Sequence, residues 1–300
     1  MNQQIYDVII IGGSYAGLAA AMALGRSLRK VLVIDAGKPC NRQTPHSHNF
    51  ITQDGKAPLE ILKEARVQVE QYKTVHFHAG LAINSQKTTT GFEVGTEKGV
   101  VFKAKKLILA TGIKDILPDI NGFKACWGIS VLHCPYCHGY EVRHRPTGII
   151  ANGAAAMHYA QLISNWTNDL TLFTNGASLL TEEETKKLGA HNITIVETAI
   201  KTLYHEKGQI QSIELENGRL LPLEAAYAMV NFVQTSNLVE QLGCKLTEGG
   251  LIEVDESQET TVKDVFACGD NSSKRALAFA VASGTLAGVM VNFQLIEATF

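Results

Sequence analysis

Apolar runs bounded by glycine mark the predicted strands of this chain. Residues 5–11 form an apolar run, which is typical of a parallel strand buried on both faces. The turn GGSYAG follows at residues 12–17, and after it come an alanine- and leucine-rich helix pattern to about residue 29 and a strand over 31–37. This order predicts a β-α-β unit whose second strand carries Asp35 near its end.

A second unit of the same kind begins near residue 147. Its strand TGIIA leads into the turn ANGAAA, then into a helix to about residue 165 and a strand at 170–174. Two more strands are predicted within LILATG (107–112) and VFACGD (265–270), and an alanine-rich helix is predicted at 276–292. We therefore expect an α/β fold with two Rossmann-like nucleotide-binding domains.

The first turn has the features of a dinucleotide site. Gly12 permits a tight turn, Gly17 permits close helix–strand packing, and Ser14 stands where the second glycine of G-x-G-x-x-G would be. Asp35 follows Gly12 by 23 residues, which suits a carboxylate that binds a ribose. Because the N-terminus of a helix offers unpaired N–H groups to a phosphate, this turn predicts nucleotide binding.

The composition limits the partners and the cellular location that we expect for this protein, but it does not indicate the reaction. The chain has 300 residues, 45% of them hydrophobic, and a net charge of −2, so no electrostatic feature favours nucleic acid or an anionic membrane as a partner. The polar start indicates no signal peptide, and no window approaches 18 uninterrupted apolar residues, so we expect no membrane span. Four of the six cysteines are scattered singly, which favours a reducing cytoplasm over a secreted disulfide framework.

Residues 133–140 read HCPYCHGY, which fits several chemistries. The C-x-x-C spacing occurs in half of a zinc site, in c-type haem attachment as C-x-x-C-H, in glutaredoxin-like C-P-Y-C motifs and in dithiols that face a flavin. The string alone leaves these alternatives open.

The wider set of motifs resembles one family. DVIIIGGSYAGLAAA, LILATG, CPYC and VFACGD, in this order, look like the low-molecular-weight thioredoxin reductase-like flavoproteins among the pyridine nucleotide-disulfide oxidoreductases, over essentially the whole chain. The segment HCPYCHGYE is similar to relatives that include the CPYC-type FAD-dependent dithiol oxidases. The larger glutathione reductase type is disfavoured, because its C-x-x-x-x-C pair would follow strand two, where this chain has only Cys40.

The resemblance implies a discontinuous FAD domain, residues 1–113 and 232–300, with a second domain, 114–231, inserted and carrying CPYC. It implies a homodimer that acts on a small-molecule dithiol or a thioredoxin-like protein. Contacts to FAD are implied for Gly12, Gly13, Ser14, Tyr15, Ala16, Gly17, Asp35, Ala36, Gly37, Lys38, Asn41, Arg42, His48, Asp54, Leu81, Ala82, Thr111, Gly112, Asp270, Leu277 and Ala278. Leu277 and Ala278 replace the Arg-Gln that is usual in the family.

In this context the CPYC string is best interpreted as a redox dithiol. Zinc would need four ligands, and the sequence has no second C-x-x-C or histidine pair at the usual spacing. Haem attachment would require export, and glutaredoxin carries its motif near the start of a short domain. The family implies that Cys137 faces the flavin and Cys134 exchanges with substrate. His138 stands where thioredoxin reductases have a proton-exchanging aspartate, and histidine can exchange protons near neutral pH.

The second nucleotide turn departs from the family pattern. Ala151 replaces its first glycine, and NGASLL, which follows the strand at 170–174, has neither an arginine for a 2′-phosphate nor a carboxylate for a 2′-hydroxyl. We therefore expect weak or absent NADPH binding, with electrons passing from a substrate dithiol to the cysteines, FAD and then oxygen or another acceptor. The alternatives are an NADPH-dependent thioredoxin reductase and a flavin-bearing redox sensor without turnover.

Overall fold

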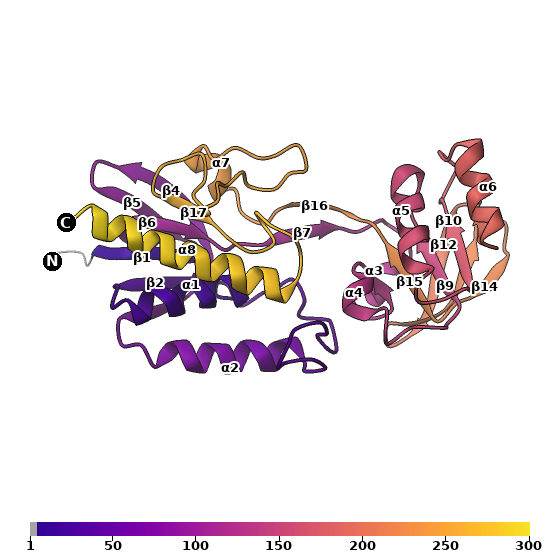
Figure 1. Cartoon of the computed structure of the whole chain (residues 1–300), viewed down its shortest axis with the longest axis horizontal. Coiled ribbons are helices and arrows are strands. Elements are labelled where there is room, and N and C mark those ends of the chain that lie inside the picture. The colour runs from indigo at the N-terminus through magenta and orange to yellow at the C-terminus, as the bar shows by residue number, and fades with distance from the viewer. Residues whose placement is uncertain (1–4) are drawn as a thin grey trace. The chain divides into compact units, whose positions relative to one another are not determined.

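The computed structural model describes residues 5–300, which divide into two compact units (Figure 1). Unit 1 holds the chain up to Arg42 together with Pro58–Lys114 and Phe232–Phe300, and unit 2 holds Gln43–Ala57 and Asp115–Asn231. The sequence placed residues 43–57 in the first domain, but their contacts group them with unit 2. This segment will be called loop 43–57.

Unit 1 is built on a seven-stranded sheet in the order β3-β2-β1-β6-β5-β4, with β17 paired to the C-terminal half of β6. Five strands are parallel (β3, β2, β1, β6 and β17), and the β4-β5-β6 part is antiparallel. The strands are β1 (Ile5–Ile11), β2 (Val31–Asp35), β3 (Val75–Ala79), β4 (Ala82–Thr88), β5 (Gly91–Thr96), β6 (Val101–Leu109) and β17 (Val265–Ala267). The helices are α1 (Tyr15–Arg26), α2 (Pro58–Glu70), α7 (Leu238–Leu242) and α8 (Leu277–Glu297).

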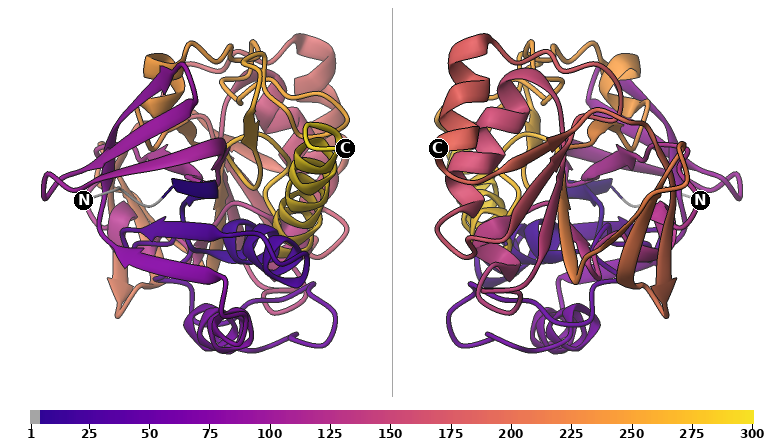
Figure 2. Two further views of the ribbon diagram at one scale, coloured as in Figure 1. Left: turned by 90° about the vertical axis from the view of Figure 1, so that its left-hand side faces the viewer. Right: turned by 90° about the vertical axis from the view of Figure 1, so that its right-hand side faces the viewer.

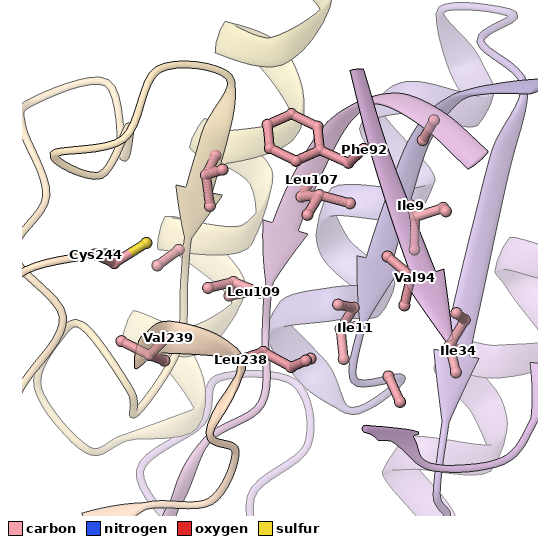
Figure 3. Close-up of a cluster of buried hydrophobic side chains, with 14 of the residues drawn as sticks. Ile9, Ile11, Ile34, Phe92, Val94, Leu107, Leu109, Leu238, Val239 and Cys244 are labelled. Carbon is pink, nitrogen blue, oxygen red and sulfur yellow. The ribbon is translucent and has the colours of Figure 1, made fainter. Parts of the chain in front are cut away.

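The apolar runs that predicted strands β1 and β6 lie in the middle of this sheet and form its core. Ile9 pairs with Leu32 on one side and Leu107 on the other, and all three side chains are buried. Phe92 and Val94 of β5 cover them, and Leu238 and Val239 of α7 pack against the same cluster (Figure 3). A strand buried on both faces needs no polar alternation, which explains the nearly continuous apolar sequence of β1.

Helix α1 contacts both α2 and α8, and small residues allow its close approach to α8 (Figures 1 and 2). A Cβ on Gly284 would overlap the carbonyl oxygen of Ala16, and one on Gly288 would lie 2.7 Å from the carbonyl oxygen of Ala20. Helix α8 is 21 residues long and apolar enough that, by length and composition alone, it could cross a membrane. The sequence-based expectation of no membrane span rested on the lack of long uninterrupted apolar runs, and Ser283, Thr285 and Asn292 interrupt the apolar residues of α8. Its contact with α1, together with its small residues, is typical of a core helix.

Unit 2 contains a five-stranded parallel sheet in the order β11-β10-β9-β15-β8 and an antiparallel sheet in the order β12-β13-β14. The strands are β8 (Val131–Leu132), β9 (Thr147–Ile150), β10 (Leu170–Phe173), β11 (Thr194–Val196), β12 (Ile200–Glu206), β13 (Gln209–Leu215), β14 (Leu220–Pro222) and β15 (Ala225–Ala228). The helices are α3 (Phe123–Cys126), α4 (Pro135–His138), α5 (Gly153–Ile163) and α6 (Glu182–Ala190). Strands β7 (Ile113–Ile116) and β16 (Asn231–Gln234) pair with each other where the chain passes between the units. The predicted α/β fold with two Rossmann-like sheets is thus confirmed.

Candidate functional site

The turn between β1 and α1 has the shape that the sequence predicted. Gly12 has φ +107°, and a Cβ there would overlap the carbonyl oxygen of Ala110; a Cβ on Gly17 would overlap the carbonyl oxygen of Gly12. Asp35, the last residue of β2, accepts a hydrogen bond from the Gly13 N–H at 3.1 Å. The N-cap residue Ser14 makes no side-chain cap, so the first N–H groups of α1 have no partner within the helix.

The carboxyl ends of β6 and β17 lie along the same edge of the sheet as this turn, because all these strands are parallel. Thr111 follows β6, and Gly269 and Asp270 follow β17. Asn271 is fully buried and donates to the Leu109 carbonyl at 2.8 Å and to Thr111 Oγ1 at 3.2 Å. Within residues 5–300, Asn271 Oδ1 has no hydrogen-bond partner, and neither has the buried Ser272 Oγ.

These features fit the cofactor that the resemblance implies. A glycine turn that excludes any Cβ, a helix N-terminus without a side-chain cap and two buried polar atoms without partners suit the phosphates and hydroxyls of a dinucleotide. In unit 1, the residues that could hold FAD are therefore those of the β1–α1 turn, the end of β2 and the ends of β6 and β17. The specific contacts to FAD stay predictions.

The other predicted cofactor residues of unit 1 are spread over its loops. Ala36, Gly37 and Lys38 follow β2 and are exposed, and Arg42 donates to the Pro39 carbonyl. Asn41 hydrogen-bonds the buried Tyr15, whose hydroxyl donates to the Pro58 carbonyl at 2.7 Å. The Leu81 carbonyl already accepts from the Glu97 N–H at 2.9 Å. Ala82 is buried as the first residue of β4, and Gly112 has φ +65°. Leu277 and Ala278 form the first turn of α8.

Cys134 and Cys137 form a disulfide in unit 2, with their Cα atoms 5.3 Å apart. Cys134 is the N-cap of α4, which ends after one turn at His138. A macrodipole needs several aligned peptide units, so this short helix contributes little to a Cys137 thiolate. Gly139 packs against Trp166, which also contacts the ring of Tyr136 edge-on at 5.7 Å. The short helix is therefore fixed to the body of unit 2.

His48 and Asp54, predicted to contact FAD, lie in loop 43–57 and belong to unit 2. The rings of His48 and His138 are 6.2 Å apart and nearly perpendicular. Nδ1 of His48 is 3.6 Å from a carboxylate oxygen of Asp54 and 3.6 Å from one of Glu141. Burial and the neighbouring His48 lower the pKa of His138, although Glu141 acts in the opposite direction. At neutral pH His138 is therefore mainly a proton acceptor.

The other cysteines provide no second redox centre. Cys126, Cys244 and Cys268 are buried thiols, and burial raises the pKa of each one, in Cys268 to about 12. Because the thiolate is the reactive form, burial makes these three less reactive than an exposed thiol. Cys40 is exposed and directs its sulfur toward Asp270 at 3.7 Å. Across the described chain, no three histidine, cysteine or acidic side chains come together as a metal site.

Asn152 occupies the first turn of the second nucleotide unit with its own side chain. As the N-cap of α5, its Oδ1 accepts from the Gly153 N–H at 2.9 Å and from the Leu179 N–H at 2.8 Å. Its Nδ2 donates to the carbonyls of Thr174 and Ala177 at 3.3 and 2.9 Å. All four hydrogen-bonding positions of this amide are thus used, and they tie residues 174–179 to the start of α5.

A carboxylate stands beside the same loop. Glu197 follows β11, and its Oε1 accepts from the Ser178 N–H at 3.0 Å, while its carbonyl accepts from the Gly176 N–H at 2.9 Å. Residues 174–181 contain no lysine or arginine. A 2′-phosphate beside this loop would meet the Glu197 carboxylate and no lysine or arginine of residues 174–181, which disfavours NADPH at this turn.

Sequence reasoning missed four polar residues that the structure brings into these sites. Three of them had a usable signal: Asn271 directly follows Asp270, Glu141 lies in the same short segment as the cysteines, and Asn152 replaces a residue of a recognised turn. Glu197 had none, because a parallel β10–β11 pairing is what brings it beside residues 174–178.

Comparisons with known proteins agree with this architecture. The family model described as "Pyridine nucleotide-disulphide oxidoreductase" matches residues 6–285. The chain is 32% identical over 309 residues to "Thioredoxin reductase tcpT" of Claviceps purpurea, covering 98% of this chain and 96% of the relative. Among solved structures it is similar to a putative thioredoxin reductase, TrxB, of Bacillus anthracis (TM-score 0.94, 30% identity, 98% and 100% of the chains). An oxidoreductase of Agrobacterium tumefaciens is similar as well (TM-score 0.92, 38% identity, 98% and 99%).

These matches extend over nearly the whole chain. The matched region includes both Rossmann-like sheets and the Cys134–Cys137 disulfide. The family typically binds FAD, and the strand-end edge of unit 1 fits that cofactor. The chain therefore belongs to the low-molecular-weight, thioredoxin reductase-like group of the pyridine nucleotide-disulphide oxidoreductase family and is an FAD-dependent oxidoreductase of that type.

Proposed function

We propose that this protein oxidises dithiols without NADPH, passing two electrons from a substrate dithiol to the Cys134–Cys137 disulfide and then to FAD, with oxygen or another acceptor at the end. The observation that carries this proposal is the side chain of Asn152, which accepts from the first N–H group of α5 and ties residues 174–179 to that helix end, where a dinucleotide phosphate would otherwise bind. Glu197 adds a negative charge beside the same loop.

The cysteine pair and His138 perform the chemistry on the protein side. A substrate thiolate attacks Cys134, which forms a mixed disulfide and releases Cys137 as a thiolate. The second substrate thiol then displaces Cys134, so that the substrate leaves as a disulfide and both electrons stay on the cysteines. Bound FAD supplies a two-electron acceptor for the reduced pair. His138, half-buried and mainly neutral, accepts the proton that the dithiol releases.

Two substrate classes suit this site. One is a small-molecule dithiol, which the exposed Tyr136 and Tyr140 beside the disulfide would contact. The other is a thioredoxin-like protein, which is supported by relatives named thioredoxin reductases. Three buried thiols outside any disulfide favour a reducing compartment, and we propose the cytoplasm.

The NADPH part of this proposal is tested by anaerobic titration of the purified flavoprotein. We expect NADPH to bleach the flavin slowly and without saturation at micromolar concentration, because residues 174–181 offer no cation to its 2′-phosphate. A dithiol should bleach the same sample completely, and this serves as the control for a competent flavin. Saturable bleaching by micromolar NADPH within turnover time would instead support an NADPH-dependent thioredoxin reductase.

We also propose a homodimer that forms through the exposed face of α8. Phe279, Leu286, Val289, Phe293 and Ile296 are 38–51% exposed, and their spacing of seven, three, four and three residues places them in one stripe. This is the a/d spacing with which helices pair. A second copy of this chain would bury the stripe, whereas α1 covers the opposite face.

Val289→Glu should therefore convert the dimer to a monomer, because a carboxylate in the middle of the paired stripe would be buried without a partner. Light scattering behind a sizing column measures the mass. Leu220→Glu is the matched control, since Leu220 of β14 is a similarly exposed apolar residue in the other unit. A monomeric wild type, or a Val289→Glu variant that remains dimeric, would contradict this interface.

A further inference from the structure

Loop 43–57 brings a second histidine to the one that follows the cysteine pair. His48 and His138, here called the histidine pair, have ring centres 6.2 Å apart with an interplanar angle of 87°. Two residues of different segments are thus held edge to face, although 90 positions separate them in the sequence. Both are partly buried, and His48 Nδ1 has no hydrogen-bond partner among residues 5–300.

Titratable groups from two segments lie close to this pair. From loop 43–57, Asp54 lies 3.6 Å from His48 Nδ1, and His46 has its ring 6.4 Å from that of His48. From the segment after α4, Glu141 also lies 3.6 Å from His48 Nδ1, and its charge acts on both His138 and the buried Tyr227 hydroxyl. A separation of 3.6 Å is too long for a hydrogen bond, so these carboxylates act through their charge.

We propose that His48 is a positioning residue that acts through His138, so that the two imidazoles together accept and release the proton exchanged by the cysteine pair. This rests on the dithiol chemistry proposed above. It also gives His48 a role in unit 2, in place of the cofactor contact expected from the family resemblance.

The proton balance shows what the histidine pair has to accept. Reduction of the Cys134–Cys137 disulfide by a dithiol moves two electrons to the cysteines and frees two S–H protons. One of these protons is transferred to Cys134. The other must be accepted by another group, because Cys137 stays a thiolate. His138 accepts it, and the positive charge that results is stabilised by Glu141. His48 can pass the charge on toward Asp54, which is exposed to solvent.

The sign of the pH dependence follows from the charges. Since His48 lowers the pKa of His138, its removal should raise that pKa toward the ordinary value of 6.5. Since Glu141 raises it, removal of the carboxylate should lower it further. Disulfide reduction that needs neutral His138 is lost as the pH falls through this pKa. The acid limb should therefore move to higher pH in His48→Gln and to lower pH in Glu141→Gln.

The experiment measures reduction of the disulfide in the purified flavoprotein by dithiothreitol. Samples are quenched with a maleimide, and the number of labelled thiols is counted by mass spectrometry between pH 5 and 8.5. At each pH the rate of the variant is divided by the rate of the wild type, because the ionisation of dithiothreitol changes both rates by the same factor. For His48→Gln we expect about a tenfold lower rate at pH 7, at the low end of what general base catalysis contributes, and a ratio that changes with pH.

His46→Gln is the matched control, because His46 is an exposed histidine on the same loop whose Nδ1 lies 2.9 Å from the Gly55 carbonyl. Its ratio should stay at one. Added imidazole should restore part of the rate to His48→Ala. Any of three results would overturn the proposal. The rate ratio of His48→Gln could be independent of pH, the acid limbs of His48→Gln and Glu141→Gln could shift in the same direction, or imidazole could fail to restore any rate. Neither NADPH nor oxygen enters this assay, so its outcome is independent of whether the protein proves to be a dithiol oxidase.

Discussion

Serine at Cys134 is expected to abolish turnover and to leave Cys137 as a persistent thiolate. With its partner removed, Cys137 can no longer form the disulfide, and neutral His138 beside it can take its proton. If Cys137 faces the flavin, as the family implies, a charge-transfer absorption band should appear at long wavelength without any reductant. The one-turn helix α4 contributes little here, so we expect the band to follow the ionisation of this thiol with pH.

Cys137→Ser is the matched variant. It should abolish turnover equally, because either serine removes the disulfide, but it should show no long-wavelength band. Visible spectra of both proteins between pH 5 and 9, with flavin content measured in parallel, decide the assignment. A band in Cys137→Ser would reverse the roles of the two cysteines. Normal activity in either variant would show that the pair is not the redox centre.

The second large effect is expected for Gly12→Ala. Alanine rarely adopts φ +107°, and its Cβ would overlap the Ala110 carbonyl oxygen. Backbone strain and overpacking together should cost on the order of 3 kcal/mol of unfolding free energy. For a unit of this size that corresponds to a fall in Tm of about 10 °C. FAD content should fall as well, because the turn would have to move away from the cofactor phosphates.

Gly99→Ala is the control for positive φ alone. Gly99 has φ +76° in the same unit, but an added Cβ there has no atom within 4 Å. This substitution should lower the free energy of unfolding by about 1 kcal/mol and leave FAD bound, since only the left-handed backbone conformation is unfavourable for alanine. Thermal unfolding and flavin absorbance per protein measure both quantities. Equal losses in the two variants would show that close packing against β6 does not matter at Gly12.

The amino-acid sequence by itself determined the elements that local physics specifies. The apolar runs that become β1 and β9 read as buried parallel strands, and the turn at Gly12–Gly17 could be recognised because only glycine tolerates its backbone and its close contacts. The C-x-x-C spacing likewise places Cys134 and Cys137 within reach of each other, whatever the rest of the fold. Helix ends were less accurate: α8 continues to Glu297, five residues beyond its expected end, because nothing in that segment stops a helix.

Tertiary structure alone decided which distant residues meet. Loop 43–57 looked like part of the cofactor domain by its place in the sequence, yet its contacts set His48 against His138. Parallel pairing of β10 and β11 brings Glu197 to Ser178, and the hydrogen bonds of Asn152 close the nucleotide turn. Such contacts depend on how segments pack across long separations, and no periodicity or spacing in the chain encodes them. Strand and turn signals are local, whereas the contact of His48 with His138 and the hydrogen bonds of the second nucleotide turn are properties of the packed fold.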